Sequence, residues 1–118
     1  MAVSPEFRDY ILEMLEPMGA VTARAMFGGA GLYLDGTIFG LIADEVVYFK
    51  VDAGNREDYE AVGSGPFVPF ADKPYPMSYW EVPAEVMEDA EVLRAWTLKA
   101  WEAGRRTGAK KKGRGGRR

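Results

Sequence analysis

The fold is decided by RAMFGGAGLYLDGTIFGLIADEVVYFKVD, residues 24–52, the densest apolar stretch of the chain. Gly28-Gly29, Asp35-Gly36 and Asp44-Glu45 divide it into runs of strand length that are rich in β-branched and aromatic residues. Asp-Gly between two such runs favours a type I′ hairpin, because both central residues of that turn need a positive φ. The Asp44-Glu45 turn lacks a glycine and is the weaker signal. The stretch predicts a meander of antiparallel strands around which the rest of the chain is arranged.

Six strands are predicted in all, four of them in or beside this stretch. They cover, in order, residues 21–27, 31–34, 37–43, 46–51, 67–70 and 77–82. Pro69 favours an edge position for the fifth strand, since proline lacks the N–H of a ladder. Apolar and polar residues alternate poorly in residues 37–51. This indicates that the second face of the sheet is either covered or contacts a partner.

Three helices are predicted around these strands, over residues 4–18, 55–62 and 83–104. Ser4-Pro5 and Asn55 are typical helix starts, while Gly63 and Gly104 are typical ends. The resulting fold class is α+β, with two layers and an antiparallel sheet of about five or six strands packed by helices. The element order is α-β-β-β-β-α-β-β-α.

The composition indicates one soluble domain with an unusual distribution of charge. The 118 residues include no cysteine and no histidine, which favours a reducing, cytoplasmic location and removes the commonest catalytic base. No apolar stretch is long enough to span a bilayer. Residues 1–104 hold 7 of the 15 Lys and Arg but all 18 acidic residues, a net charge of −11. We expect residues 1–104 to form the domain and residues 105–118 to be a disordered basic Gly/Lys/Arg tail.

The basic tail is the candidate nucleic-acid site. Its cations could neutralise phosphates and release counterions, which gives sequence-independent, salt-sensitive binding to DNA or RNA. A solubilising tail, or one that folds back on the acidic domain, is an equal alternative. The eight residues are Arg105, Arg106, Lys110, Lys111, Lys112, Arg114, Arg117 and Arg118.

Nothing in the sequence favours an enzyme, a metal or a cofactor. A strand follows the Gly28-Gly29-Ala30-Gly31 loop, whereas a phosphate site needs a helix at that point. Acidic pairs such as Glu57-Asp58 fall on predicted exposed helix faces or turns, and Ser64 and Ser78 have no histidine as a base. We predict no catalytic, metal or cofactor-binding residues, and a small carboxylate-based enzyme is the least favoured class.

A protein interface is expected on the sheet or its edge. The apolar residues of residues 37–51 and the late aromatic residues would mark it wherever they are exposed. For the aromatic residues, packing of the last helix against the final hairpin is the favoured explanation. The candidate interface residues are Phe39, Leu41, Phe67, Phe70, Tyr79 and Trp80.

Several ordered motifs resemble the N-terminal domain of the TfoX/Sxy family of competence regulators. They are MFGGAGLYLDGTIFGLIADEVVYFKVD, Asn55-Arg56 with Tyr59-Glu60, Gly65-Pro66-Phe67 and Tyr79-Trp80-Glu81-Val82-Pro83. The resemblance implies a domain related in architecture to type III secretion chaperones, and a transcriptional co-activator without a catalytic site. Full-length relatives look like two-domain proteins. Because the basic tail stands where their helical C-terminal domain begins, we expect the first domain alone.

These observations predict a non-enzymatic cytoplasmic regulatory module in transcription or competence regulation. Its partners would be a protein, either a transcription activator or a second copy in a homodimer, and non-specific DNA or RNA through the tail, without a membrane. The alternative is a nucleic-acid-binding protein that acts mainly through residues 105–118.

Overall fold

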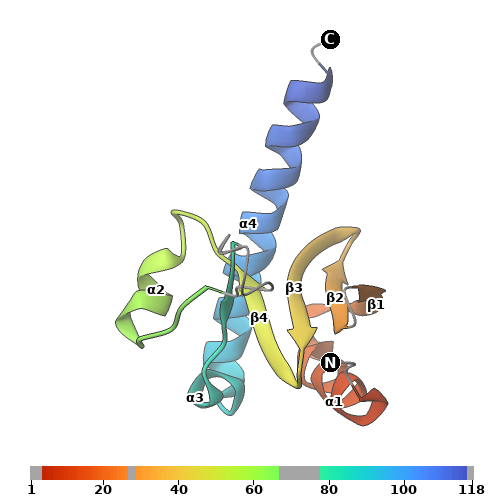
Figure 1. The fold of residues 1–118 in the computed structure, drawn as a ribbon, viewed down its shortest axis with the longest axis vertical. Coiled ribbons are helices and arrows are strands. Elements are labelled where there is room, and N and C mark those ends of the chain that lie inside the picture. Colours follow the sequence, from red (N-terminus) through yellow and green to blue (C-terminus); the bar gives the residue numbers. More distant parts are fainter. Residues whose placement is uncertain (1–3, 27–28, 67–77, 117–118) are drawn as a thin grey trace, which may run out of the picture.

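The computed structural model describes residues 4–26, 29–66 and 78–116, and it has the predicted α+β architecture (Figure 1). Five antiparallel strands form one sheet in the order β1-β2-β3-β4-β5. The strands are β1 (Thr22–Met26), β2 (Gly29–Leu34), β3 (Thr37–Ala43), β4 (Val46–Lys50) and β5 (Tyr79–Glu81). The predicted strand over residues 67–70 lies outside the described residues.

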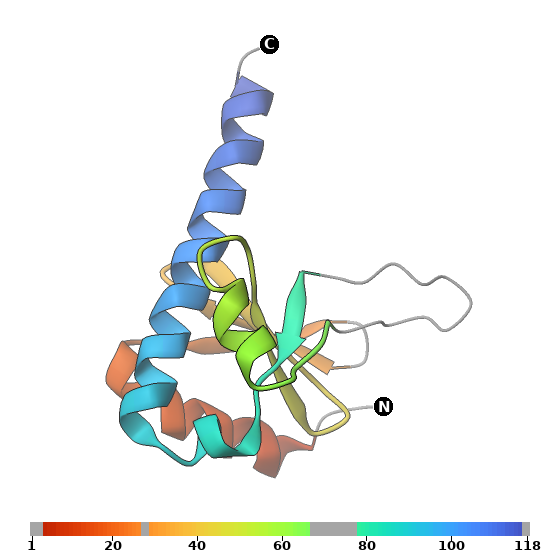
Figure 2. The ribbon, with the colours of Figure 1, turned by 90° about the vertical axis from the view of Figure 1, so that its left-hand side faces the viewer.

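The helices gather on one side of this sheet, as the turned view makes plain (Figure 2). They are α1 (Pro5–Leu15), the short 3-10 helix η1 (Glu16–Met18), α2 (Arg56–Ala61), α3 (Ala84–Met87) and α4 (Ala90–Gly116). The chain runs through them in the order α1, η1, β1 to β4, α2, β5, α3 and α4. Because α1 and α4 lie behind the sheet, the domain has two layers and one core between them (Figures 1 and 2).

Two rows of cross-strand neighbours define the two faces of the sheet. The inner row consists of Ala23, Leu32, Gly40, Phe49 and Trp80, one residue from each strand. Leu32 and Phe49 in this row are completely buried in the core beneath the helices.

The outer row alternates with the inner row along every strand. It consists of Arg24, Gly31, Leu41, Tyr48 and Glu81. No described helix lies over this row, so the helices cover only one of the two faces (Figure 2).

A β-bulge interrupts the pairing of β2 with β3 at Phe39. Leu32 pairs with Gly40, but Tyr33 pairs with Ile38, so Phe39 has no partner on β2. A bulge of this kind adds one residue and re-aims a side chain. Here it directs the ring of Phe39 into the core, where it packs edge-on against Phe49 with ring centres 5.7 Å apart. This is one reason why the sequence of β3 does not alternate cleanly.

Both predicted hairpin turns form, with different conformational costs. Asp35 and Gly36 have φ values of 52° and 78°, as a type I′ turn requires. Asp44 and Glu45 also have positive φ values, 51° and 63°, although neither is a glycine. A side chain in this region costs free energy, so the second turn has a cost at Glu45 that Gly36 avoids in the first.

The helix starts agree with the sequence except at Asn55. The hydroxyl of Ser4 accepts a hydrogen bond from the backbone N–H of Phe7, which caps α1 as expected. Asn55 precedes α2, but its side chain makes no cap. Its Oδ1 accepts from the backbone N–H of Asp52 and its Nδ2 donates to the carbonyl of Lys50, so Asn55 fixes the turn after β4 instead.

The predicted bounds of the last helix, residues 83–104, were wrong. It is broken into α3 and α4 because the carboxylate of Asp89 accepts hydrogen bonds from the N–H groups of Glu91 and Val92 and starts a new helix there. The helix also does not end at Gly104 but runs on to Gly116. The expected disorder of residues 105–118 in solution stays a prediction, which amide hydrogen exchange along α4 would test.

Candidate functional site

The C-terminal helix α4 is fastened to the sheet at the point where the basic residues begin. The indole Nε1 of Trp101 donates a hydrogen bond of 2.9 Å to the carbonyl of Leu34. One turn later Gly104 lies directly against the backbone of β3, where a Cβ atom would overlap the carbonyl oxygen of Ile38. Glycine therefore serves here as a close-packing residue within the helix, although it was predicted to end it.

Two ion pairs join α4 to the turn and helix that follow β4. Arg106 binds the carboxylate of Asp52 through Nε at 2.7 Å and Nη2 at 2.9 Å. This bidentate contact lowers the pKa of Asp52 and raises that of Arg106, in both cases chiefly through the hydrogen bonds between them. Nearby, the ammonium of Lys99 lies 2.9 Å from the carboxylate of Asp58 on α2.

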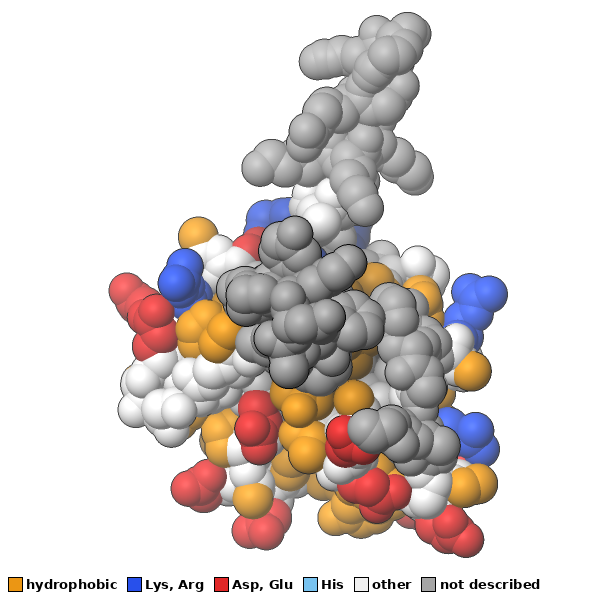
Figure 3. All heavy atoms as spheres, in the orientation of Figure 1, with side chains coloured by type: hydrophobic (Ala, Val, Ile, Leu, Met, Phe, Trp, Pro, Cys, Tyr) orange, Lys and Arg blue, Asp and Glu red, His pale blue; other side chains and the backbone are white. Residues whose placement is uncertain are grey.

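The eight basic residues predicted as a nucleic-acid site fall into three groups. Arg106 contacts the acidic body, and the guanidinium of Arg105 lies over the ring of Trp101 at 5.0 Å. Lys110, Lys111, Lys112 and Arg114 lie on the part of α4 that projects beyond the sheet (Figures 1 and 2). Arg117 and Arg118 lie outside the described residues. At the body, acidic side chains gather along its lower rim, opposite the projecting helix (Figure 3).

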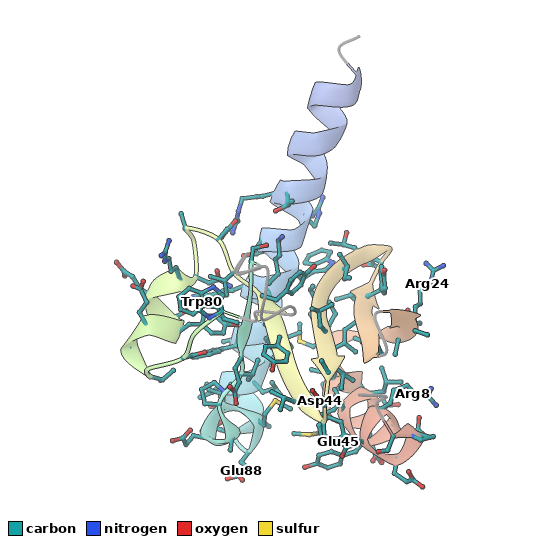
Figure 4. The ribbon with its side chains drawn as sticks, viewed as in Figure 1. Arg8, Arg24, Asp44, Glu45, Trp80 and Glu88 are labelled. Carbon is teal, nitrogen blue, oxygen red and sulfur yellow. The ribbon has the colours of Figure 1, made fainter. Side chains whose placement is uncertain are left out.

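Two of the six predicted interface residues belong to the helix side of the sheet. Phe39 is completely buried in the core because of the bulge, so its ring is a core residue and not a surface one. Trp80 is half-buried in the inner row and lies between α2 and β4 (Figure 4). Its ring packs against Tyr59 of α2 with the ring centres 6.2 Å apart.

Leu41 and Tyr79 are the predicted interface residues on the outer face. Leu41 belongs to the outer row. Tyr79 pairs with Lys50, and both lie on the outer face because they are two residues from Glu81 and Tyr48 of the outer row. Both are nearly buried, with exposed fractions of 4% and 7%. Burial, with a smaller contribution from Tyr33, raises the pKa of Tyr79 to about 12. Phe67 and Phe70 lie outside the described residues.

The rest of the outer face presents half-buried tyrosines beside cations. The guanidinium of Arg24 lies 5.4 Å from the ring centre of Tyr33, and Arg24 points outward at the β1 edge (Figure 4). The ammonium of Lys50 lies 5.0 Å from the ring centre of Tyr79. Burial and the nearby carboxylates of Glu81 and Asp44 raise the pKa of Tyr48. This face therefore combines aromatic surface with the two cations Arg24 and Lys50.

A cleft of about 580 Å³ lies between α2 and the ends of β4 and β5. Its apolar lining includes Trp80 and Pro66, and its charged lining consists of Asp52, Glu57, Glu60 and Arg56. Arg56 lies over the ring of Trp80 at 5.7 Å and also pairs with Glu60 at 3.0 Å. The cleft therefore holds a guanidinium between an indole and a carboxylate.

The sequence did not point to this cleft. Arg56 and Glu60 have the spacing of an ordinary surface pair on a helix, and the sequence predicts Glu57 on an exposed helix face. The missing information was the pairing of β5 with β4, which brings Trp80 beside α2 across a long stretch of chain. Asn55-Arg56 and Tyr79-Trp80 are both among the motifs that resemble the TfoX family, but their sequence does not show that they lie together in the fold.

The described residues hold no cluster of three or more potential metal ligands. Gly29, Ala30 and Gly31 belong to β2 and pair with β1, so at these three positions the predicted loop is strand. Gly28 lies outside the described residues. One buried polar atom is left without a hydrogen bond in the described part, the hydroxyl of Tyr59. Burial raises the pKa of that phenol far above its usual range. Within residues 4–26, 29–66 and 78–116, no helix is long and apolar enough to cross a membrane.

The chain matches the sequence model of a known protein family. The sequence model of the TfoX N-terminal domain covers residues 13–104, which is the end of α1 from Glu13 to Leu15, the whole sheet and the anchored part of α4. A search of curated proteins found no match.

Proposed function

This chain belongs to the TfoX N-terminal domain family, and on that premise we propose that it is a non-enzymatic regulatory module of transcription or competence that acts through protein contacts. The single observation that carries the proposal is the match over residues 13–104, because it spans the folded body. A cytoplasmic location goes with the proposal, since a chain without cysteine is suited to a reducing compartment.

Protein contact through the outer face of the sheet is the first part of the proposal. In its favour, the outer row brings Tyr48 beside Leu41, and the half-buried Tyr33 lies on the same face beside a cation. Tyrosine and arginine are enriched at protein interfaces, because a rigid aromatic side chain buries much area at little entropic cost. The partner is a transcription activator or a second copy of this chain.

Photo-crosslinking tests this part. A benzophenone amino acid replaces Tyr48 on the outer face in one variant and Tyr10 in the control, where the ring is 54% exposed on α1. We expect a cross-linked product, of doubled mass for a homodimer, from position 48 and none from position 10. Equal yields from both positions, or none across a wide concentration range, would contradict an outer-face interface.

Non-specific nucleic-acid affinity is the second part of the proposal. The charge separation supports it, since the acidic body carries a helix whose projecting end is rich in Lys and Arg. Residues 107–118 contain six of the basic residues. If all six contact phosphates of duplex DNA, the logarithm of the association constant falls with the logarithm of salt concentration with a slope of about −5.

Fluorescence anisotropy with a labelled duplex of arbitrary sequence measures this slope for the full chain and for a chain that ends at Arg106. Loss of binding in the shortened chain is expected, because Arg106 is already paired with Asp52. Unchanged binding after removal of residues 107–118 would assign any nucleic-acid affinity to the body instead.

A further inference from the structure

The cleft between α2 and β5 has the chemistry of a site for a cationic side chain. We propose that it binds an arginine side chain on an extended segment of the partner protein. The inference rests on the proposed function as a protein-binding module and names the chemistry of one contact. Trp80, Pro66, Glu57 and Glu60 are the residues that would make it, around a space of about 580 Å³.

The first argument is that the cleft already accommodates a guanidinium of the chain itself. Arg56 lies over the indole of Trp80 at 5.7 Å, which is the range in which the ring quadrupole attracts a cation. Its Nε lies 3.0 Å from the carboxylate of Glu60. An aromatic face and a carboxylate are thus presented at the separation that one guanidinium needs.

The second argument is that Arg56 is a weak occupant. Its side chain is 61% exposed, and that of Glu60 is 52% exposed. Surface ion pairs with this spacing on a helix contribute little, since water screens them and two long side chains must be ordered. An arginine from a partner can therefore replace Arg56 at Trp80 and Glu60.

The third argument is the balance of charge around the cleft. Among the described residues its lining contains three carboxylates, those of Asp52, Glu57 and Glu60, and one cation, Arg56. Arg106 neutralises Asp52 and Arg56 neutralises Glu60. Within the described part of the chain Glu57 has no ion pair, so one negative charge at the rim is left for an incoming cation.

Arginine is favoured over lysine by the shape of the site. A planar guanidinium stacks on an indole and offers several N–H donors to carboxylates on either side, whereas an ammonium is a compact and strongly hydrated charge. The apolar surface of Trp80 and Pro66 would lie along the side-chain stem. The open form of the cleft suits a segment of extended chain that lies across it.

The test uses the full chain and three short peptides, Gly-Arg repeats and the same repeats with lysine or with citrulline in place of arginine. Citrulline keeps the shape of arginine and removes its charge. Backbone and indole NMR signals of the ¹⁵N-labelled protein report binding by residue. We expect saturable shifts at the Trp80 indole and in residues 52–60, in the affinity order arginine, lysine, citrulline. Shifts spread over the whole acidic surface, or no saturable shifts, would overturn the proposal.

Three variants separate the cleft from the general attraction of an acidic protein. The double variant Glu57→Gln with Glu60→Gln should bind the arginine peptide roughly five- to tenfold more weakly. Glu85→Gln with Glu88→Gln removes the same charge from α3 and its end, away from Trp80 (Figure 4), and should leave binding almost unchanged. Arg56→Gln removes the competing guanidinium and should tighten binding.

Equal weakening by both double variants, or weaker binding in Arg56→Gln, would refute the site. Neither result bears on the outer face or the basic helix. A cross-link from position 48 or DNA binding by residues 107–118 would then still support the proposed function. Conversely, if neither the cross-link nor DNA binding is observed but the peptide binds as expected, the cleft is still a peptide site.

Discussion

The guanidinium of Arg106 and the carboxylate of Asp52 form a bidentate pair between residues 54 positions apart in the chain. Asp52 lies two residues after the end of β4, and Arg106 lies two residues beyond the glycine that packs on β3. The pair therefore joins the first basic residues of the C-terminal helix to the acidic body. It also removes one of the eight cations from the set that is available to nucleic acid.

Removing this pair should destabilise the domain modestly. Arg106→Gln and Asp52→Asn should each lower the free energy of unfolding by about 0.5–1 kcal/mol, because the pair is partly exposed and screened by water. The free energy of unfolding of the double variant should fall by no more than the larger of the two single decreases plus a few tenths of a kcal/mol. Urea unfolding of the four proteins measures the coupling, and strict additivity would contradict a direct interaction.

The same pair predicts a pH dependence at the acidic end. Arg106 lowers the pKa of Asp52 in the folded chain below its ordinary value of 3.8. A lowered folded pKa adds stability above the unfolded value and loses it as pH falls through the folded value. The stability difference between the natural chain and Asp52→Asn should thus be constant from pH 7 to 5 and shrink below about pH 4. Thermal unfolding at each pH checks this, and a difference that grows on acidification would refute it.

Gly104 should not tolerate a side chain. A Cβ atom there would overlap the carbonyl of Ile38, so Gly104→Ala must push α4 away from β3 despite the better helix propensity of alanine. Overpacking of this kind costs about 1–3 kcal/mol. Gly65→Ala is the control, because a Cβ at Gly65 meets no atom within 4 Å. A gain of stability in Gly104→Ala would show that the helix is not seated on the sheet at this point.

The Asp44-Glu45 turn should improve with a glycine. Glu45 has a φ of 63°, and glycine adopts that conformation without a steric penalty. Glu45→Gly should raise the free energy of unfolding by about 1 kcal/mol. Glu45→Ala is the matched control, since it also removes the contact of the carboxylate with the N–H of Ser4 but keeps the strain. Calorimetry that ranks alanine at or above glycine would rule out strain as the cause.

Tyr59→Phe should not destabilise the domain. The hydroxyl of Tyr59 is buried without a hydrogen bond, and such a group costs about 1–3 kcal/mol of desolvation. The ring itself packs on Trp80 and Trp96, so Tyr59→Ala should lose about 3–5 kcal/mol. Chemical denaturation separates the two effects. A large loss in Tyr59→Phe would mean that the hydroxyl has a bound water as its partner.

Local patterns predicted the sheet and the start of the first helix. Asp35-Gly36 specifies its turn by backbone conformation alone, and Ser4-Pro5 specifies a cap, so both follow from neighbouring residues. The bulge at Phe39 could not be predicted from neighbouring residues, because it depends on how β2 pairs with β3. Because of this bulge Phe39, a predicted interface residue, lies in the core.

Longer-range contacts explain the remaining differences. Gly104 has the character of a helix end, yet its lack of a side chain is used for contact with β3 instead. Asp89 was not recognised as a helix start within an apparently continuous helical pattern. The cleft is formed by α2 and β5, and the residues 67–77 that separate them in sequence carry no local signal for that pairing.

One continuous helix, α4, both covers the core and carries the basic residues at its end. The helical order of the basic end and the docking of the first turns on the sheet are therefore coupled in free energy. The hydrogen-bonded backbone runs without a break from Ala90 to Gly116, past the anchors at Trp101 and Arg106. Any ligand that favours the helical form of the last residues also favours the docked form of the first ones, by linkage. Melting temperature measured with and without DNA would therefore register events at the far end of the helix as a change in the stability of the sheet.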